Sequence, residues 1–199
     1  ALASVAGSSI KVLEELGERS EEFEWAVIIH VPGFDRPLAV WTEPARQMSD
    51  EELQVSGGVR CSWVVGIEGV LEPSDPLRDY TGLMRLLLRS LPDAPAVLDV
   101  STNRWTSRPS LEAMFERKEV EPPADLLWVV EARRRADAEE SGCWMRTRGL
   151  ARCGRPELEM LGVPGRQADT AAEVLSGMAA MLFEAEPPDP GVPWQIGHG

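Results

Sequence analysis

The run from Cys143 to Gly149 places an aromatic residue and two arginines at alternate positions. On a strand, this spacing puts Trp144, Arg146 and Arg148 on one face and Thr147 on the other. Guanidinium groups beside an aromatic ring can hold a carboxylate, a phosphate or an acidic side chain. In a chain with 33 Asp and Glu residues, pairing with the protein's own acids is the more common outcome. The run therefore predicts an anion-contacting face, either as a ligand site or as an internal ion pair.

Two carboxylates, Glu157 and Glu159, follow this run. Two residues apart, they share a face on a strand but point about 200° apart on a helix. Pro156 is typical of a first helical position, and the positive end of the helix dipole stabilises an acid just after it. We therefore predict a helix start with Glu157 as a capping acid, with general acid–base chemistry as the alternative. The full candidate binding set is Trp144, Arg146, Thr147, Arg148, Glu157 and Glu159.

Asp99 is a further candidate for a catalytic base. It ends a predicted strand, a position where catalytic groups often lie in parallel sheets. Ser101, Thr102 and Asn103 follow it, so a turn closed by side-chain hydrogen bonds fits the sequence at least as well. Catalytic residues therefore stay unassigned at this point.

The chain has few histidines and cysteines that could act in catalysis or bind a metal. The two histidines are His30, in a β-branched run, and His198, next to the last residue. The three cysteines form no Cys-x-x-Cys pair, and no glycine-rich phosphate-binding loop occurs. We therefore expect no metal, no cofactor and reduced thiols, as is typical of a cytoplasmic protein.

The formal net charge of −13 limits the partners that the protein can bind. Such a surface repels phosphate backbones and anionic lipids, so we expect no nucleic acid and no membrane partner. No apolar run approaches the roughly 18 residues that span a bilayer, which predicts a soluble protein. The partners that remain are a basic protein or a small anionic ligand.

Helix and strand signals alternate along the chain and predict an α+β fold. Apolar residues at three- and four-residue steps, capping residues and prolines indicate the helices. Short β-branched runs between turn residues indicate the strands. The predicted helices are 8–16, a short helix capped at Ser49, 76–91, 109–117 and 170–184, and the predicted strands are 24–31, 37–42, 59–67, 95–100, 126–133 and 143–150.

These elements suggest one domain over residues 1–186 with a mixed or antiparallel central sheet. The helices 76–91 and 170–184 are expected to flank it. Strands 126–133 and 143–150 are expected to be antiparallel neighbours, because a short polar segment joins them. Residues 187–199 are rich in proline and glycine, which predicts a tail or a linker toward a further segment.

Residues 144–162 carry a family resemblance. The strings Trp-Met-Arg-Thr-Arg-Gly-Leu and Gly-Arg-Pro-Glu-Leu-Glu resemble the bacterial family named domain of unknown function 4026. Members of that family have a His-Thr-His-Gly-Leu-like string after the aromatic residue. Arg146 and Arg148 stand where that pattern has histidines, so a metal or proton-transfer role of paired histidines does not carry over to this chain.

The sequence as a whole favours a non-enzymatic binding, interaction or regulatory module with an acidic surface. The alternative is a small hydrolase or transferase that holds an anionic substrate with Arg146 and Arg148. In that alternative, Asp99 or Glu157 would serve as the base.

Overall fold

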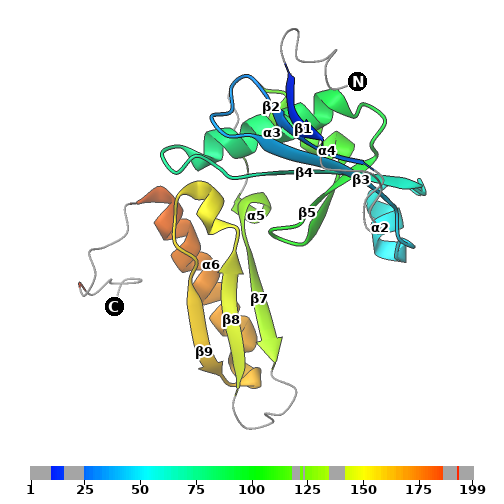
Figure 1. Cartoon of the computed structure of the whole chain (residues 1–199). Coiled ribbons are helices and arrows are strands. Elements are labelled where there is room, and N and C mark those ends of the chain that lie inside the picture. The colour runs from blue at the N-terminus through cyan, green and yellow to red at the C-terminus, as the bar shows by residue number, and fades with distance from the viewer. Residues whose placement is uncertain are drawn as a thin grey trace. The chain divides into compact units, whose positions relative to one another are not determined.

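The computed structural model describes residues 10–15, 25–117, 122, 124–134, 142–185 and 192. Two compact units divide the chain, the N-terminal unit Ala1–Glu121 and the C-terminal unit Pro122–Gly199. Helices and antiparallel strands occur in both units (Figure 1), so the predicted α+β class is confirmed. The described strands form three sheets, however, where the pattern predicted one central sheet. The predicted domain boundary at residue 186 lies outside the described residues, as does the predicted tail apart from residue 192.

The N-terminal unit contains a four-stranded antiparallel sheet in the order β1-β2-β3-β4 and a two-stranded sheet of β5 and β6. Its elements are β1 (Lys11–Glu15), β2 (Trp25–His30), β3 (Leu38–Pro44), α2 (Asp50–Val55), β4 (Trp63–Gly69), α3 (Pro76–Ser90), β5 (Ala96–Asp99), β6 (Arg104–Ser107) and α4 (Arg108–Phe115).

Helix α3 begins where the sequence predicted. The Asp75 carboxylate accepts a hydrogen bond from the Arg78 backbone N–H at 3.1 Å, and Pro76 occupies the first helical position. The helix buries Leu86 in a core that it shares with Val27 and Val40 of the four-stranded sheet. The predicted strands 24–31 and 37–42 are found as β2 and β3, which pair as antiparallel neighbours.

The first strand corrects a prediction. The three-residue steps over 8–16 predicted a helix, but Lys11–Glu15 is strand β1, paired antiparallel with β2. A short apolar run cannot distinguish a helix from a strand by periodicity, and here the hydrogen bonds of the sheet ladder determine the backbone. The sequence also missed β6, which pairs antiparallel with β5 as a half-buried hairpin.

The C-terminal unit contains a three-stranded antiparallel sheet of β7 (Val129–Arg134), β8 (Cys143–Arg148) and β9 (Glu159–Val163). Helix α6 (Ala168–Glu184) runs along one face of it (Figure 1), and the two share a core cluster that includes Met145 and Leu175. The predicted pairing of β7 with β8 is confirmed. The shorter elements are α5 (Ala124–Leu127), η1 (Leu150–Cys153) and η2 (Gly165–Gln167).

Two boundaries in this unit differ from the prediction. Leu126 and Leu127 belong to the single turn of α5, so strand β7 begins only at Val129. Helix α6 begins at Ala168, two residues before the predicted start at residue 170. The 3₁₀ turn η2 leads directly into α6, so the helix starts before Thr170.

The capping box at Ser49 is confirmed, and its Glu52 carboxylate joins a partly buried cluster. The Glu52 carboxylate accepts hydrogen bonds from the Ser49 N–H at 2.7 Å and from Trp105 Nε1 at 2.9 Å, and it forms an ion pair with Arg46. The Ser49 hydrogen bond is the main cause that lowers the pKa of Glu52. Burial opposes this shift, and Arg46 and Trp105 add to it.

Because the pKa of Glu52 is lowered by folding, its contribution to stability is present at neutral pH. That contribution is lost as the pH falls through the unfolded pKa and then the folded pKa. We expect Glu52→Gln to lower the melting temperature at about pH 7. The difference in melting temperature between the two proteins is expected to shrink toward about pH 3. Thermal unfolding of both proteins across this range tests the prediction. A melting-temperature difference that stays constant with pH would contradict it.

Candidate functional site on the C-terminal sheet

The candidate face lies on β8, the central strand of the C-terminal sheet. Its side chains alternate between two faces. Cys143, Met145 and Thr147 are buried, and Cys143 and Met145 belong to the cluster that α6 covers. The half-buried residues on the opposite face are Trp144, Arg146 and Arg148. The alternation predicted from the sequence is thus confirmed.

The arginines of this face converge on a carboxylate of the neighbouring strand. The register of β7 and β8 places Glu131 directly opposite Arg146. Arg146 donates from Nε at 3.2 Å and from Nη2 at 3.1 Å to Glu131 Oε1, and Arg148 Nε lies 3.2 Å from the same oxygen. Arg133 approaches the other oxygen, with its Nε 3.6 Å from Oε2. The internal ion pair that the sequence left open therefore exists, and its acid is Glu131.

Two opposing effects act on the Glu131 carboxyl. Burial by itself would raise its pKa. The hydrogen bonds from Arg146 and the charges of Arg148, Arg146 and Arg133 outweigh burial and hold the pKa of Glu131 below its ordinary value. The carboxylate is therefore charged at neutral pH, and the guanidinium groups are aligned around it.

Trp144 provides the aromatic part of the face. The guanidinium carbon of Arg146 lies 5.1 Å from its ring centroid and that of Arg133 lies 5.9 Å from it. Both distances are in the range of a cation–π contact. The indole Nε1 is buried and has no hydrogen-bond partner within the described part of the chain.

We name this surface the arginine–tryptophan face, and it consists of Arg133, Trp144, Arg146 and Arg148 around Glu131. Sequence reasoning found three of the five residues. Arg133 and Glu131 are not among its candidates. The alternation of Val129, Glu131 and Arg133 on the neighbouring predicted strand was the signal that could have identified both.

Glu157 and Thr147 form a separate cluster, with Thr147 on the buried side of β8 and Glu157 exposed. Thr147 is fully buried, and its hydroxyl donates to Glu157 Oε2 at 2.7 Å and accepts from the Leu158 N–H at 2.8 Å. Glu157 Oε1 accepts from the Gly149 N–H at 2.8 Å and from the Ala151 N–H at 3.3 Å. The structure thus assigns both side chains to local hydrogen bonds.

These contacts correct the predicted helix start at Pro156. Residues 156–158 form no helix and lead into strand β9. Glu157 does cap a helical turn, but that turn is η1: its carboxylate accepts hydrogen bonds from N–H groups at the start of η1. The residue before η1, Gly149, has a φ of 109°. A side chain at position 149 would be strained at this backbone angle.

Glu159 lies on β9 with its Cα opposite that of Arg146. Cross-strand partners share a face, so Glu159 belongs to the same side of the sheet as the arginine–tryptophan face. Its side chain is exposed. The sequence did not predict β9, although Met160, Leu161 and Val163 gave a short apolar run after the acid.

The remaining candidates lie elsewhere. Asp99 belongs to the N-terminal unit, and its carboxylate accepts from the Ser101 N–H at 3.0 Å, which is the predicted turn. The three cysteines are free, and burial raises the pKa of Cys153 to about 11. Among the described residues, no group of His, Cys, Asp and Glu side chains is arranged to hold a metal ion, and no helix has the length and apolar character to cross a membrane.

Comparisons with known proteins give one family. The model of the family described as protein of unknown function (DUF4026) C-terminal matches residues 130–199, which include β8, β9 and α6. No curated protein and no solved structure matches the chain. The match contains the segment 144–162 on which the resemblance was recognised. Residues 130–199 are therefore similar to the C-terminal region of the DUF4026 family.

Proposed function

We propose that this protein is a non-enzymatic binding module and that its arginine–tryptophan face recognises an anionic group. The ligand chemistry is a carboxylate or phosphate, carried by a small molecule or by an acidic side chain. Planar guanidinium groups hold such groups with two hydrogen bonds at once, and an adjacent indole ring supports the guanidinium by cation–π contact.

The observation that carries the proposal is the convergence of three guanidinium groups on one carboxylate. Glu131 Oε1 receives both Arg146 contacts and the Arg148 contact, whereas Oε2 is approached by Arg133 at the longer distance of 3.6 Å. Glu131 thus occupies the position that a ligand carboxylate would take. A chain with a net charge of −13 repels anions at long range, so recognition depends on these short-range contacts.

The competing enzyme hypothesis has less support from the geometry. Its two candidate bases are both engaged, Asp99 with the Ser101 N–H and Glu157 with Thr147, Gly149 and Ala151. A general base must reach the proton that it abstracts, and these contacts assign both carboxylates to backbone structure.

Two substitutions in the cluster are expected to change anion binding in opposite directions. With a hexaglutamate peptide as the probe, Arg146→Ala is expected to weaken binding about tenfold, because the two-point contact is lost. Glu131→Gln is expected to strengthen it about tenfold, because a neutral amide competes less for the guanidinium groups. Titration calorimetry of the three proteins measures both effects.

Arg166→Ala is the matched control, since Arg166 is an exposed arginine of the same unit and its loss changes the net charge equally. It is expected to leave hexaglutamate affinity unchanged. Both cluster variants are also expected to lose about 1 kcal/mol of stability, because an ion pair at a partly exposed site contributes little more. If both variants lose stability while hexaglutamate binding stays unchanged or absent, the cluster is a structural ion pair and the proposal is wrong.

A further inference from the structure

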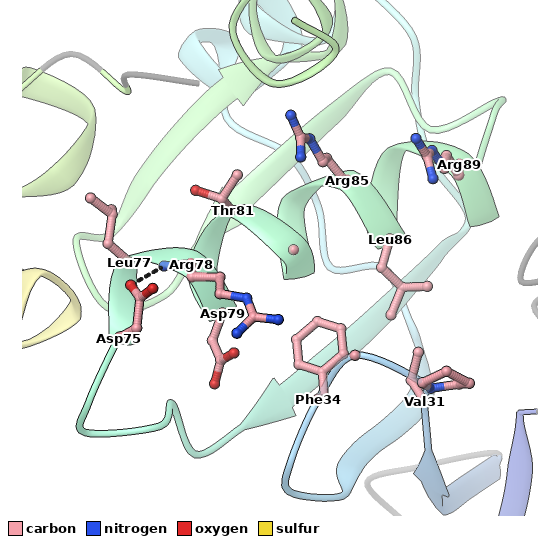
Figure 2. A pocket seen from close by; sticks show the side chains of 13 residues that line it. Val31, Phe34, Asp75, Leu77, Arg78, Asp79, Thr81, Arg85, Leu86 and Arg89 are labelled. Atoms are coloured by element: carbon pink, nitrogen blue, oxygen red, sulfur yellow. Dashed lines mark hydrogen bonds between the residues drawn. The ribbon is translucent and has the colours of Figure 1, made fainter. Parts of the chain in front are cut away.

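A groove in the N-terminal unit lies between α3 and the turn that joins β2 to β3. Its volume is about 610 Å³. Figure 2 shows the helix along one wall with Phe34 and Val31 of the turn on the other. None of these residues belongs to the arginine–tryptophan face. The groove therefore offers a second place where a ligand can bind.

Three arginines of α3 line the groove: Arg78, Arg85 and Arg89. They are seven and four residues apart, so at 100° per residue they lie within about 40° of one another around the helix. None of the three forms an ion pair with a described acidic residue. In a chain with 33 acids, three such arginines on one helix face are a local concentration of positive charge.

Arg85 is held in place before any ligand arrives. Its Nε donates to the Phe115 carbonyl at 2.8 Å and its Nη2 to the Arg117 carbonyl at 2.6 Å. These acceptors are neutral, so the guanidinium keeps its full charge while losing its freedom to move. Arg89 lies one helical turn further on and is exposed. The pair forms a cationic end of the groove.

The acids of the groove lie toward the other end of the helix. Asp75 caps α3 through the Arg78 N–H, and Asp79 accepts from the Glu72 N–H at 2.8 Å. Asp75 precedes Arg85 by ten residues, which is about 15 Å along the helix axis. Asp79 precedes Arg85 by six residues, about 9 Å along the axis, so a ligand anion at Arg85 and Arg89 lies about a Debye length or more from both acids at physiological salt.

The middle of the groove is apolar. Phe34 packs against the helix at Gly82, where an added Cβ would lie 3.2 Å from the ring atom Cζ. The absence of a side chain at Gly82 thus lets the ring approach the helix backbone. Leu86 and Val31 complete this part of the lining. An aromatic or other apolar group can pack here next to the cationic end.

We propose that this groove binds a small molecule with an anionic head and a flat apolar body. The head, a carboxylate or a phosphate, contacts Arg85 and Arg89, and the body packs against Phe34 over Gly82. Arg85 and Arg89 follow Gly82 by three and seven residues, about 5 and 10 Å along the helix axis, so one small molecule can reach the arginines and Phe34 at once.

The probes are phenyl phosphate and phenylacetate, each added to the full chain at about 10 mM, which exceeds the millimolar Kd expected for so small a molecule. Amide NMR spectra are expected to shift at Phe34, Gly82, Arg85 and Arg89 with at least one of them. A shift with only one probe identifies the head as phosphate or carboxylate. Arg89→Ala is expected to weaken that binding about tenfold, because one of two guanidinium contacts is lost.

Arg60→Ala removes one exposed positive charge from the same unit and is the matched control, with no expected change in affinity. Inorganic phosphate and benzyl alcohol test the two halves separately, and each is expected to bind at least tenfold more weakly than the better probe. The proposal is overturned if neither probe shifts the groove amides. It is also overturned if inorganic phosphate binds as well as phenyl phosphate, or if Arg60→Ala weakens binding as much as Arg89→Ala.

Discussion

Replacing Leu175 with alanine is expected to lower the free energy of unfolding of the C-terminal unit by about 2–5 kcal/mol. Leu175 is 1% exposed and packs in one cluster with Cys143, Met145 and Val163 of the sheet. The helix residue Ala171 in this cluster is small, so little neighbouring volume is available to fill the cavity. Hydrogen exchange of the β8 amides measures the loss of unfolding free energy at the strand that carries the candidate face.

Val174→Ala is the control on the same helix. Val174 is 41% exposed, and alanine has the higher helix propensity, so the free energy of unfolding is expected to change by less than about 0.5 kcal/mol. Equal effects of the two substitutions would show that α6 does not pack on the sheet through Leu175. Packing of other residues would then have to stabilise the buried face of β8.

The parts of the fold that the sequence predicted are those in which several local signals agree. Helix α3 has an N-cap at Asp75, a proline at its first position and an apolar stripe, and it forms where predicted. Strand β8 has strict alternation, so its two faces could be assigned before the structure was known. In both elements the local preference and the tertiary packing require the same conformation.

The errors occur where a distant partner determines the structure. Residues 11–15 have a helical spacing, but the ladder with β2 makes them a strand. Pro156 and Glu157 look like a helix start, yet hydrogen bonds to Thr147 and Gly149 place them before a strand. Local patterns do not contain this information, because the partner is a strand or a turn elsewhere in the chain.

The candidate site shows the same division. The alternation of β8 placed Trp144, Arg146 and Arg148 together, because a strand has a fixed period of two. The acid that they contact depends on the register between β7 and β8, which sets Glu131 opposite Arg146. Register follows from pairing across the loop, so the sequence indicated an acidic partner without identifying Glu131.

Thr147→Val is expected to lower the free energy of unfolding by about 2–3 kcal/mol, although valine matches threonine in shape. The Thr147 hydroxyl is fully buried, donates to Glu157 Oε2 and accepts from the Leu158 N–H. Valine removes this acceptor and leaves the N–H without its side-chain partner, and it also removes one of the contacts that hold the Glu157 carboxylate against Gly149. Denaturant unfolding followed by circular dichroism measures the difference.

Thr147→Ser separates the hydroxyl from the methyl group. Serine keeps both hydrogen bonds and loses only a buried methyl, so its cost is expected to be about 1 kcal/mol and below that of valine. The opposite order would mean that packing against the core, and not the hydrogen bonds, makes position 147 important. Thr147 would then be an ordinary core residue, and the link from β8 through Glu157 to the turn at Gly149 would have no role in stability. If the expected order is found, the turn after β8 is fixed from the buried side of the strand.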